Sequence, residues 1–163
     1  MNSLLEFIMT DPEKIQFKNK LKQFALSLIG QRITAARESI EQAQQAANQE
    51  EKSSAGDKYE TSRAMGHLQK DMHARQLAEH AKEQATLHQI NVEAVYPAAT
   101  SGAFISCPGI AFFIAAGLGK QLTEGQTIYF LSPHAPLAKA LEHKKTGDSI
   151  HFNSMNLPIL DIY

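Results

Sequence analysis

The spacing of proline residues constrains the fold of this chain most strongly. Pro12 is followed by no further proline until Pro97, and the residues between them are rich in Ala, Gln, Glu and Lys. Proline breaks helix interiors, whereas these four residue types favour helix, so the stretch is predicted to be helical. After Pro97 short Ile- and Phe-containing runs alternate with Gly and Pro, which is typical of strands and turns. We therefore expect an α+β protein.

Residues 17–91 are predicted to form a long antiparallel coiled-coil hairpin. One helix is expected from about Pro12 to about Glu50 and a second from about Asp57 to about Ile90, with small residues and a glycine at the tip, residues 52–60. The apolar stripe of the first helix is Leu21, Ala25, Leu28, Ile29, Ile33, Ala36, Ile40, Ala43 and Ala47. The weaker stripe of the second is Met65, Leu68, Met72, Ala78, Ala81, Ala85, Leu87 and Ile90.

Residues 92–163 are predicted to form a small α+β domain, and residues 1–16 an N-terminal extension. One short helix is expected at about Pro136 to His143, where Pro136 suits the first helical position. Residues 153–156 are expected to join the last two strands as a hairpin loop, and glycines at 117, 119 and 125 to mark a connection between strands. The expected strands are Gly102–Ser106, Ile110–Ala116, Thr127–Leu131, Ser149–Asn153 and Leu157–Ile162.

Composition excludes several classes of function. The formal net charge is −1, so there is no basic excess for direct binding to nucleic acid. No run approaches the roughly 18 apolar residues of a membrane span, and the N-terminus is a poor signal peptide. Cys107 is the single cysteine and cannot form an intrachain disulfide, which fits a reducing compartment. We expect a cytoplasmic protein that is a monomer and has no membrane partner.

Two carboxylates and an aromatic residue stand at the predicted hairpin tip. Asp57 and Glu60 have the spacing of a capping box, in which the first residue caps the helix and the other lies at its third position. Tyr59 has little core to join there, so a partner contact and local packing both remain open.

Four histidines fall on the second predicted helix, at His67, His73, His80 and His88. Their spacings of six, seven and eight do not give the i, i+4 pair of a helical zinc site. We therefore expect these histidines to be solvated.

Two segments resemble the Gre-type bacterial transcript-cleavage factors. Gly56-Asp57-Lys58-Tyr59-Glu60 matches the G-D-x-x-E tip of that family. Residues 132–141 and 144–148, Ser-Pro-His-Ala-Pro-Leu-Ala-Lys-Ala-Leu and Lys-Lys-Thr-Gly-Asp, are similar to its S-P-x-x-P…A-L…K-K-x-G-D segment. The likeness covers roughly residues 17 to 163. In the tip, Lys58 and Tyr59 replace the Leu-Ser usual in the family, and His143 replaces a glycine after the C-terminal helix.

The resemblance implies a fold, a partner and a site. The C-terminal domain would be FKBP-like and would dock on the rim of RNA polymerase, while the hairpin enters the secondary channel. Asp57 and Glu60 would help to hold a catalytic Mg²⁺ of the polymerase, so that backtracked RNA is cleaved; the chain would not be an enzyme alone, and nucleic acid would be contacted only through the polymerase. The implied partner contacts are Lys58, Tyr59, Pro136, Lys144, Lys145 and Asp148. A non-cleaving regulator of the same channel is one alternative, and an FKBP-type peptidyl-prolyl isomerase is another.

Overall fold

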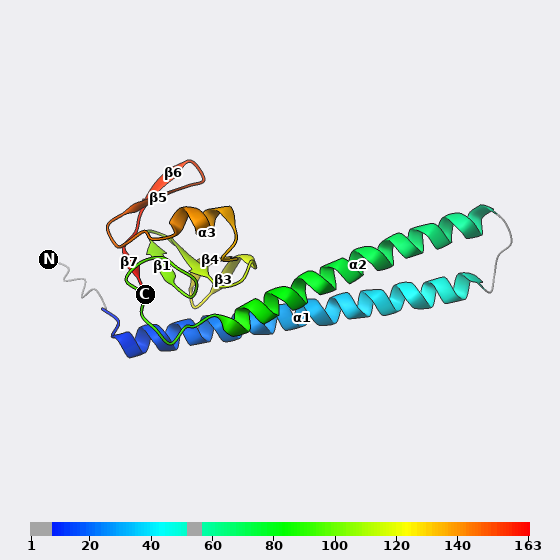
Figure 1. Cartoon of the computed structure of the whole chain (residues 1–163), viewed down its shortest axis with the longest axis horizontal. Helices are drawn as coiled ribbons and strands as arrows, with labels where there is room; N and C mark the ends of the chain where they lie inside the picture. Colours follow the sequence, from blue (N-terminus) through cyan, green and yellow to red (C-terminus); the bar gives the residue numbers. More distant parts are fainter. Residues whose placement is uncertain (1–7, 52–56) are drawn as a thin grey trace. The chain divides into compact units, whose positions relative to one another are not determined.

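Figure 1 shows the computed structural model, which describes residues 8–51 and 57–163. It is an α+β protein, as predicted, with two long helices followed by a small β-rich region. Two compact units are formed, one by residues up to Ala25 together with Thr86–Tyr163, the other by Leu26–Ala85. None of the helices described is both long and apolar enough to cross a membrane. The elements are α1 (Asp11–Glu51), α2 (Asp57–Gln89), β1 (Phe104–Cys107), β2 (Ile110–Ile114), β3 (Gly119–Thr123), β4 (Gln126–Leu131), α3 (Pro136–Leu141), β5 (Ser149–Phe152), β6 (Met155–Pro158) and β7 (Asp161–Ile162).

The Leu26–Ala85 unit is an antiparallel pair of helices (Figure 1). The α1 face is the predicted one, because Ile29, Ile33 and Ala36 are buried there. The α2 face is not. Met65, Leu68 and Met72 are exposed, at 57%, 69% and 51%, and the alanines predicted with them are exposed as well. Six described α2 residues of this unit are half-buried. All except Glu83 recur three, four or seven residues apart, which defines one helix face: Gly66, His73, Leu77, His80 and Gln84.

From Met65 to Ala85 the predicted stripe of the second helix was wrong, because the apolar residues there are divided between two faces. Leu87 and Ile90, the last two residues of the stripe, are buried as predicted. Met65, Leu68 and Met72 define one face, and Leu77 lies on the other. Two histidines complete the face that holds Leu77. His73 and His80 are half-buried, which corrects the expectation that all four are solvated, whereas His67 and His88 are exposed.

The larger unit is built on a five-stranded sheet with strand order β3-β4-β2-β1-β7. β2 and β4 are parallel, and the other neighbouring strands are antiparallel. One side of the sheet packs with α3 and with the two-stranded β5–β6 sheet. The buried residues of that core are Ala99, Ala103, Ile105, Cys107, Phe112, Ile114, Ala138, Leu141, Ile150, Leu157, Ile159 and Ile162.

The N-terminal part of α1 covers the other side of this sheet. Phe17 contacts Phe104 with ring centroids 5.1 Å apart, and Phe24 contacts Phe130 at 5.7 Å. Phe113 stacks edge-on against Phe130 at the same side. Strand alternation sends neighbouring side chains to opposite faces. Phe112 and Phe113 are nevertheless both fully buried, because both faces of the sheet are covered.

Three details of the β-rich part differ from the sequence prediction. The segment with the glycines contains an edge strand, β3, held in register by antiparallel pairing with β4. The loop between β5 and β6 has two residues rather than four, since Phe152 pairs with Met155. Asn153 and Ser154 both take positive φ angles, 49° and 63°, as a type I′ hairpin turn requires. The final predicted strand is divided into β6 and β7.

The short helix α3 ends two residues earlier than predicted. It begins at Pro136, as predicted, but ends at Leu141, and the backbone N–H of Glu142 donates to the carbonyls of Ala138 and Lys139. His143 then takes a φ angle of 67°. That left-handed conformation is the one that glycine adopts most easily after a helix.

Candidate functional site

The predicted tip lies only partly within the described residues. α1 ends at Glu51 and α2 begins at Asp57, so residues 52–56, where the turn was predicted, lie outside the described residues. The side chains of Asp57 and Tyr59, and hence the predicted cap, also lie outside them. Lys58 and Glu60 are exposed. Asp57 and Glu60 are three residues apart in the first turn of α2, which places them on neighbouring positions of one helix face. The positive end of the helix dipole favours carboxylates at this point.

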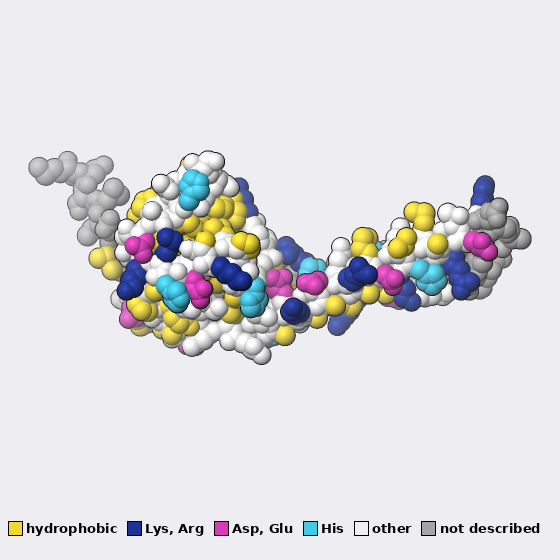
Figure 2. Space-filling model, turned by 45° about the horizontal axis from the view of Figure 1, so that its top comes forward, with side chains coloured by type: hydrophobic (Ala, Val, Ile, Leu, Met, Phe, Trp, Pro, Cys, Tyr) yellow, Lys and Arg dark blue, Asp and Glu magenta, His cyan; other side chains and the backbone are white. Residues whose placement is uncertain are grey.

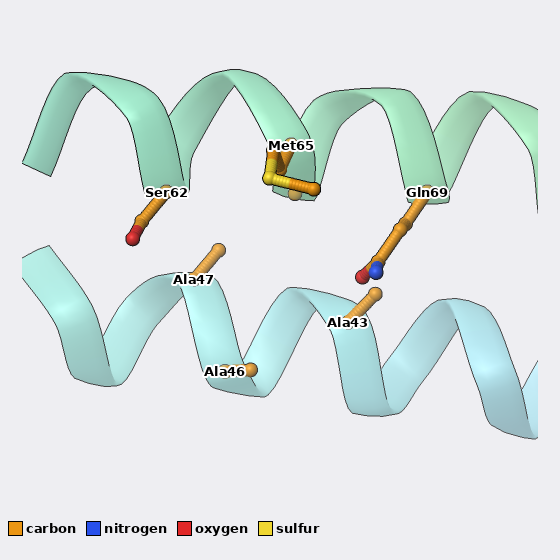
Figure 3. A pocket seen from close by; sticks show the side chains of 7 residues that line it. Ala43, Ala46, Ala47, Ser62, Met65 and Gln69 are labelled. Carbon is orange, nitrogen blue, oxygen red and sulfur yellow. The ribbon is translucent and has the colours of Figure 1, made fainter. Parts of the chain in front are cut away.

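Small residues line the helix pair close to this end. Figure 3 shows Ala43 and Ala47 of α1 opposite Ser62 and Gln69 of α2. A cavity of about 220 Å³ lies here, lined by Ala43, Ala46, Ala47, Ser62, Met65, Gly66 and Gln69. Beside it, the Lys70 ammonium donates a hydrogen bond of 2.7 Å to the Gln44 side-chain oxygen, which links the two helices. At this cavity the two helices thus present mainly small or polar side chains to each other.

The four predicted docking residues of the larger unit flank α3. Pro136 is the first residue of α3. Lys144, Lys145 and Asp148 follow the other end of this six-residue helix, which places them apart from Pro136. Asp148 has a local structural role, because its carboxylate accepts a 2.8 Å hydrogen bond from the backbone N–H of Lys145. Lys144 is half-buried, and its carbonyl accepts a hydrogen bond from the backbone N–H of Ala99. Lys145 and Pro136 are exposed and accessible to a partner.

The part of the chain that the structure describes contains no group of three or more His, Cys, Asp or Glu residues able to hold a metal ion. Asp57 and Glu60 nevertheless offer the carboxylate oxygens that Mg²⁺ prefers. Two carboxylates are the usual protein contribution to an Mg²⁺ that also binds phosphates and water. The residue types at these two positions therefore fit such an ion.

Three aromatic rings meet between the large sheet and the β5–β6 pair. Phe112, Tyr129 and Phe152 have ring centroids between 5.0 and 5.9 Å apart. Phe112 is fully buried, and the other two are half-buried. The cluster attaches the β5–β6 pair to the sheet, which gives these rings a packing role.

Lys18, the most unusual side chain of the fold, is not among the predicted site residues. It is fully buried, although a charged residue is almost never buried without partners. Its ammonium donates to the carbonyl of Ala94 at 2.5 Å and of Gly102 at 3.1 Å, and lies 4.6 Å from the centre of the Tyr96 ring. The signal was present in the spacing, because Lys18 extends the buried stripe of Leu21 and Ala25 by one further step of three residues.

Burial makes Lys18 a source of pH dependence. Desolvation lowers its pKa to about 8 from 10.5, against the opposing attraction of Glu93. Between these two values the unfolded chain binds more protons, so this lysine makes the unfolding free energy rise with pH. Burial also raises the pKa of Tyr163, with Asp161 adding to the effect, and burial raises the pKa of the Cys107 thiol. Because the unfolded chain loses these two protons first, both groups lower the unfolding free energy as the pH rises above about 9 to 10.

We expect a Lys18→Met variant to separate the lysine from these opposing groups. The difference in unfolding free energy between wild type and Lys18→Met should change in favour of wild type by up to about 3 kcal/mol as the pH rises from 8 to 10.5. Urea unfolding at several pH values measures it, and the contributions of Tyr163 and Cys107 cancel in the comparison. A difference that is constant with pH would show that Lys18 has the same pKa in both states.

Comparisons of the chain with family models, with curated proteins and with solved structures find no match. A proposal of function therefore depends on the sequence motifs and on the geometry described above.

Proposed function

We propose that this chain is a Gre-like transcription elongation factor. It binds RNA polymerase in the cytoplasm and inserts its hairpin into the secondary channel to stimulate cleavage of backtracked RNA. The observation that supports this most directly is the position of the acidic motif: Asp57 opens α2 at the end of a hairpin whose second helix is 33 residues long. At 1.5 Å per residue this arm is roughly 50 Å long, enough to extend from a surface into a deep channel.

The role of the tip follows from its chemistry. Asp57 and Glu60 supply negative charge and hard oxygen ligands at the end of the arm, and helix α2 fixes their spacing. A Mg²⁺ ion shared with the polymerase supplies, when bound, charge stabilisation for phosphodiester hydrolysis. In this proposal the two carboxylates are the chain's contribution to the shared ion, so its activity depends on the polymerase and it is not an enzyme alone.

In this proposal the larger unit has an FKBP-like fold and docks on the rim of the polymerase. The exposed Pro136 and Lys145 are the accessible members of the proposed docking set. A fragment starting at residue 92 is unsuitable for testing this, because it would lack Phe17 and Lys18, which pack against Phe104 and Gly102. The docking surface should be tested with Lys145→Glu in the full chain.

The non-cleaving channel regulator is the second candidate. Lys58 favours it, because an exposed lysine lies between the two acidic positions, where its positive charge opposes the binding of a cation. We do not propose the isomerase, since Phe112 is fully buried and its cluster packs the core.

The deciding experiment is RNA cleavage by a stalled, backtracked cognate polymerase, with and without the protein. Accelerated cleavage supports the first candidate. Binding to polymerase without acceleration supports the regulator, and the absence of binding contradicts both.

A further inference from the structure

An exposed apolar stripe runs along α2 beside the side that faces α1, and its first residue, Met65, also lines the cavity between the two helices. Met65, Leu68 and Met72 lie three and four residues apart, so they adjoin one another along one helix face. More than half of each side chain is exposed. Hydrophobic side chains among charged ones are visible along the hairpin in Figure 2. A row of three large apolar side chains on one face indicates an interaction surface more strongly than scattered single ones do.

Charged residues stand symmetrically at the two ends of this stripe. Lys58 precedes Met65 by seven residues, and Glu79 follows Met72 by seven, and both are exposed. At 100° per residue, these four residues and Leu68 fall within an arc of about 80° on the helix. Lys58 and Glu79 are each about 16 Å along the axis from the midpoint of the stripe, which lies between Leu68 and Gln69. Within this arc the face therefore has a positive end, an apolar centre and a negative end, and the exposed Arg75 lies outside it, about 20° beyond Leu68.

Such a face is complementary to itself when reversed. We propose that α2 associates with α2 of a second copy of this chain in an antiparallel arrangement, about a two-fold axis between Leu68 and Gln69. Met65 then lies opposite Met72 of the second copy, and Lys58 lies opposite Glu79 of the second copy, at both ends. An isologous contact of this type closes with two copies and leaves no further surface for growth.

The size of the face determines the strength of the association. From Lys58 to Glu79 it is about 32 Å long, and a helix face about 10 Å wide gives roughly 300 Å² from each copy. Stable specific interfaces bury about 1,200 Å² or more in total. We therefore expect a weak, reversible dimer, populated at roughly 100 μM and dissociated at low micromolar concentration. The predicted monomer is the form at low concentration.

The proposed dimer does not depend on the proposed function, but dimer formation would affect that function. The proposed contact occupies the part of α2 that follows the tip. A hairpin paired in this way has a second hairpin along one side, so it is too thick for a channel that admits a single hairpin. Association with a second copy and entry into such a channel would exclude each other.

The first test is sedimentation equilibrium of the full chain from about 5 to 500 μM, a range that spans the expected dissociation constant. Wild type should show a concentration-dependent dimer. Leu68→Glu places two like charges near the two-fold axis and should weaken the dimer at least about tenfold. Ala74→Glu is the matched control, because Ala74 is exposed on the opposite side of α2, and it should behave as wild type. The helical circular dichroism of both variants should be unchanged.

The second test is a charge exchange that fixes the antiparallel arrangement. Lys58→Glu and Glu79→Lys should each weaken the dimer about three- to tenfold, because each substitution changes two ion pairs into like-charge pairs. The double variant should restore wild-type affinity. The proposal is overturned by a wild type that is monomeric throughout, by a dimer that survives Leu68→Glu, or by a double variant that is not restored. It is also overturned if Leu68→Glu leaves self-association unchanged and weakens binding to polymerase, since the stripe then belongs to that partner.

Discussion

Asp57→Asn is expected to reduce the stimulated RNA cleavage by about 100-fold or more. The proposed role of Asp57 is to contribute charge and an oxygen ligand to a shared Mg²⁺. Stabilisation of the transition state by a metal ion is worth several kcal/mol, and each 1.4 kcal/mol or so changes the rate tenfold. Asn retains the shape of the side chain but loses the charge. The cleavage rate of a backtracked complex, at saturating concentration of each protein, measures the effect.

The melting temperature of the same variant tests whether the capping role of Asp57 is retained. Asn caps helices about as well as Asp, so the melting temperature should be unchanged. Glu60→Gln can still close a capping box and should likewise lose cleavage without loss of stability. Polymerase affinity should be retained, because docking is assigned to the larger unit. If Asp57→Asn cleaves as fast as an active wild type, these carboxylates only cap the helix.

The sequence was sufficient to predict the class of fold and most element boundaries, because these depend on local signals. Proline spacing set the limits of the helical region, and Pro136 marked the start of α3. The α1 face was predictable because its buried residues are large and lie on one stripe, as at Ile29 and Ile33. Such a signal requires no knowledge of the partner element.

The elements that were missed depend on contacts that are distant in the sequence. β3 has an exposed, polar sequence, Gly-Lys-Gln-Leu-Thr, and is a strand because β4 pairs with it. The α2 face followed His73 and His80 because a neighbouring helix, and not hydrophobicity alone, selects the face. The site was predictable as a motif, at Asp57 and Glu60, but the buried Lys18 required the structure, because its partners are 76 and 84 residues away.

Gly102→Ala is expected to destabilise the larger unit by about 3–5 kcal/mol, which is the range of the most damaging single substitutions. Gly102 has a φ angle of 88°, and a Cβ atom there would lie 2.3 Å from the backbone oxygen of Asn91. If the Asn91 carbonyl moved away, it would lose the 2.9 Å hydrogen bond that it accepts from the Tyr96 hydroxyl. The Gly102 carbonyl also accepts from the buried Lys18 ammonium. A shift of this backbone would thus leave a buried charge short of a partner, which adds to the steric cost.

Gly109→Ala separates this crowding from the cost of a positive φ angle. Gly109 has a φ angle of 72°, but nothing lies within 4 Å of an added Cβ atom, so only the backbone strain of about 1–2 kcal/mol is expected. Calorimetric melting of the full chain measures both variants. At about 4–8 °C per kcal/mol, Gly102→Ala should lower the transition of the larger unit by about 15 °C or more, and Gly109→Ala by clearly less. Equal shifts would mean that the close approach to Asn91 contributes nothing, and that Lys18 and Tyr96 adapt to a displaced backbone without loss.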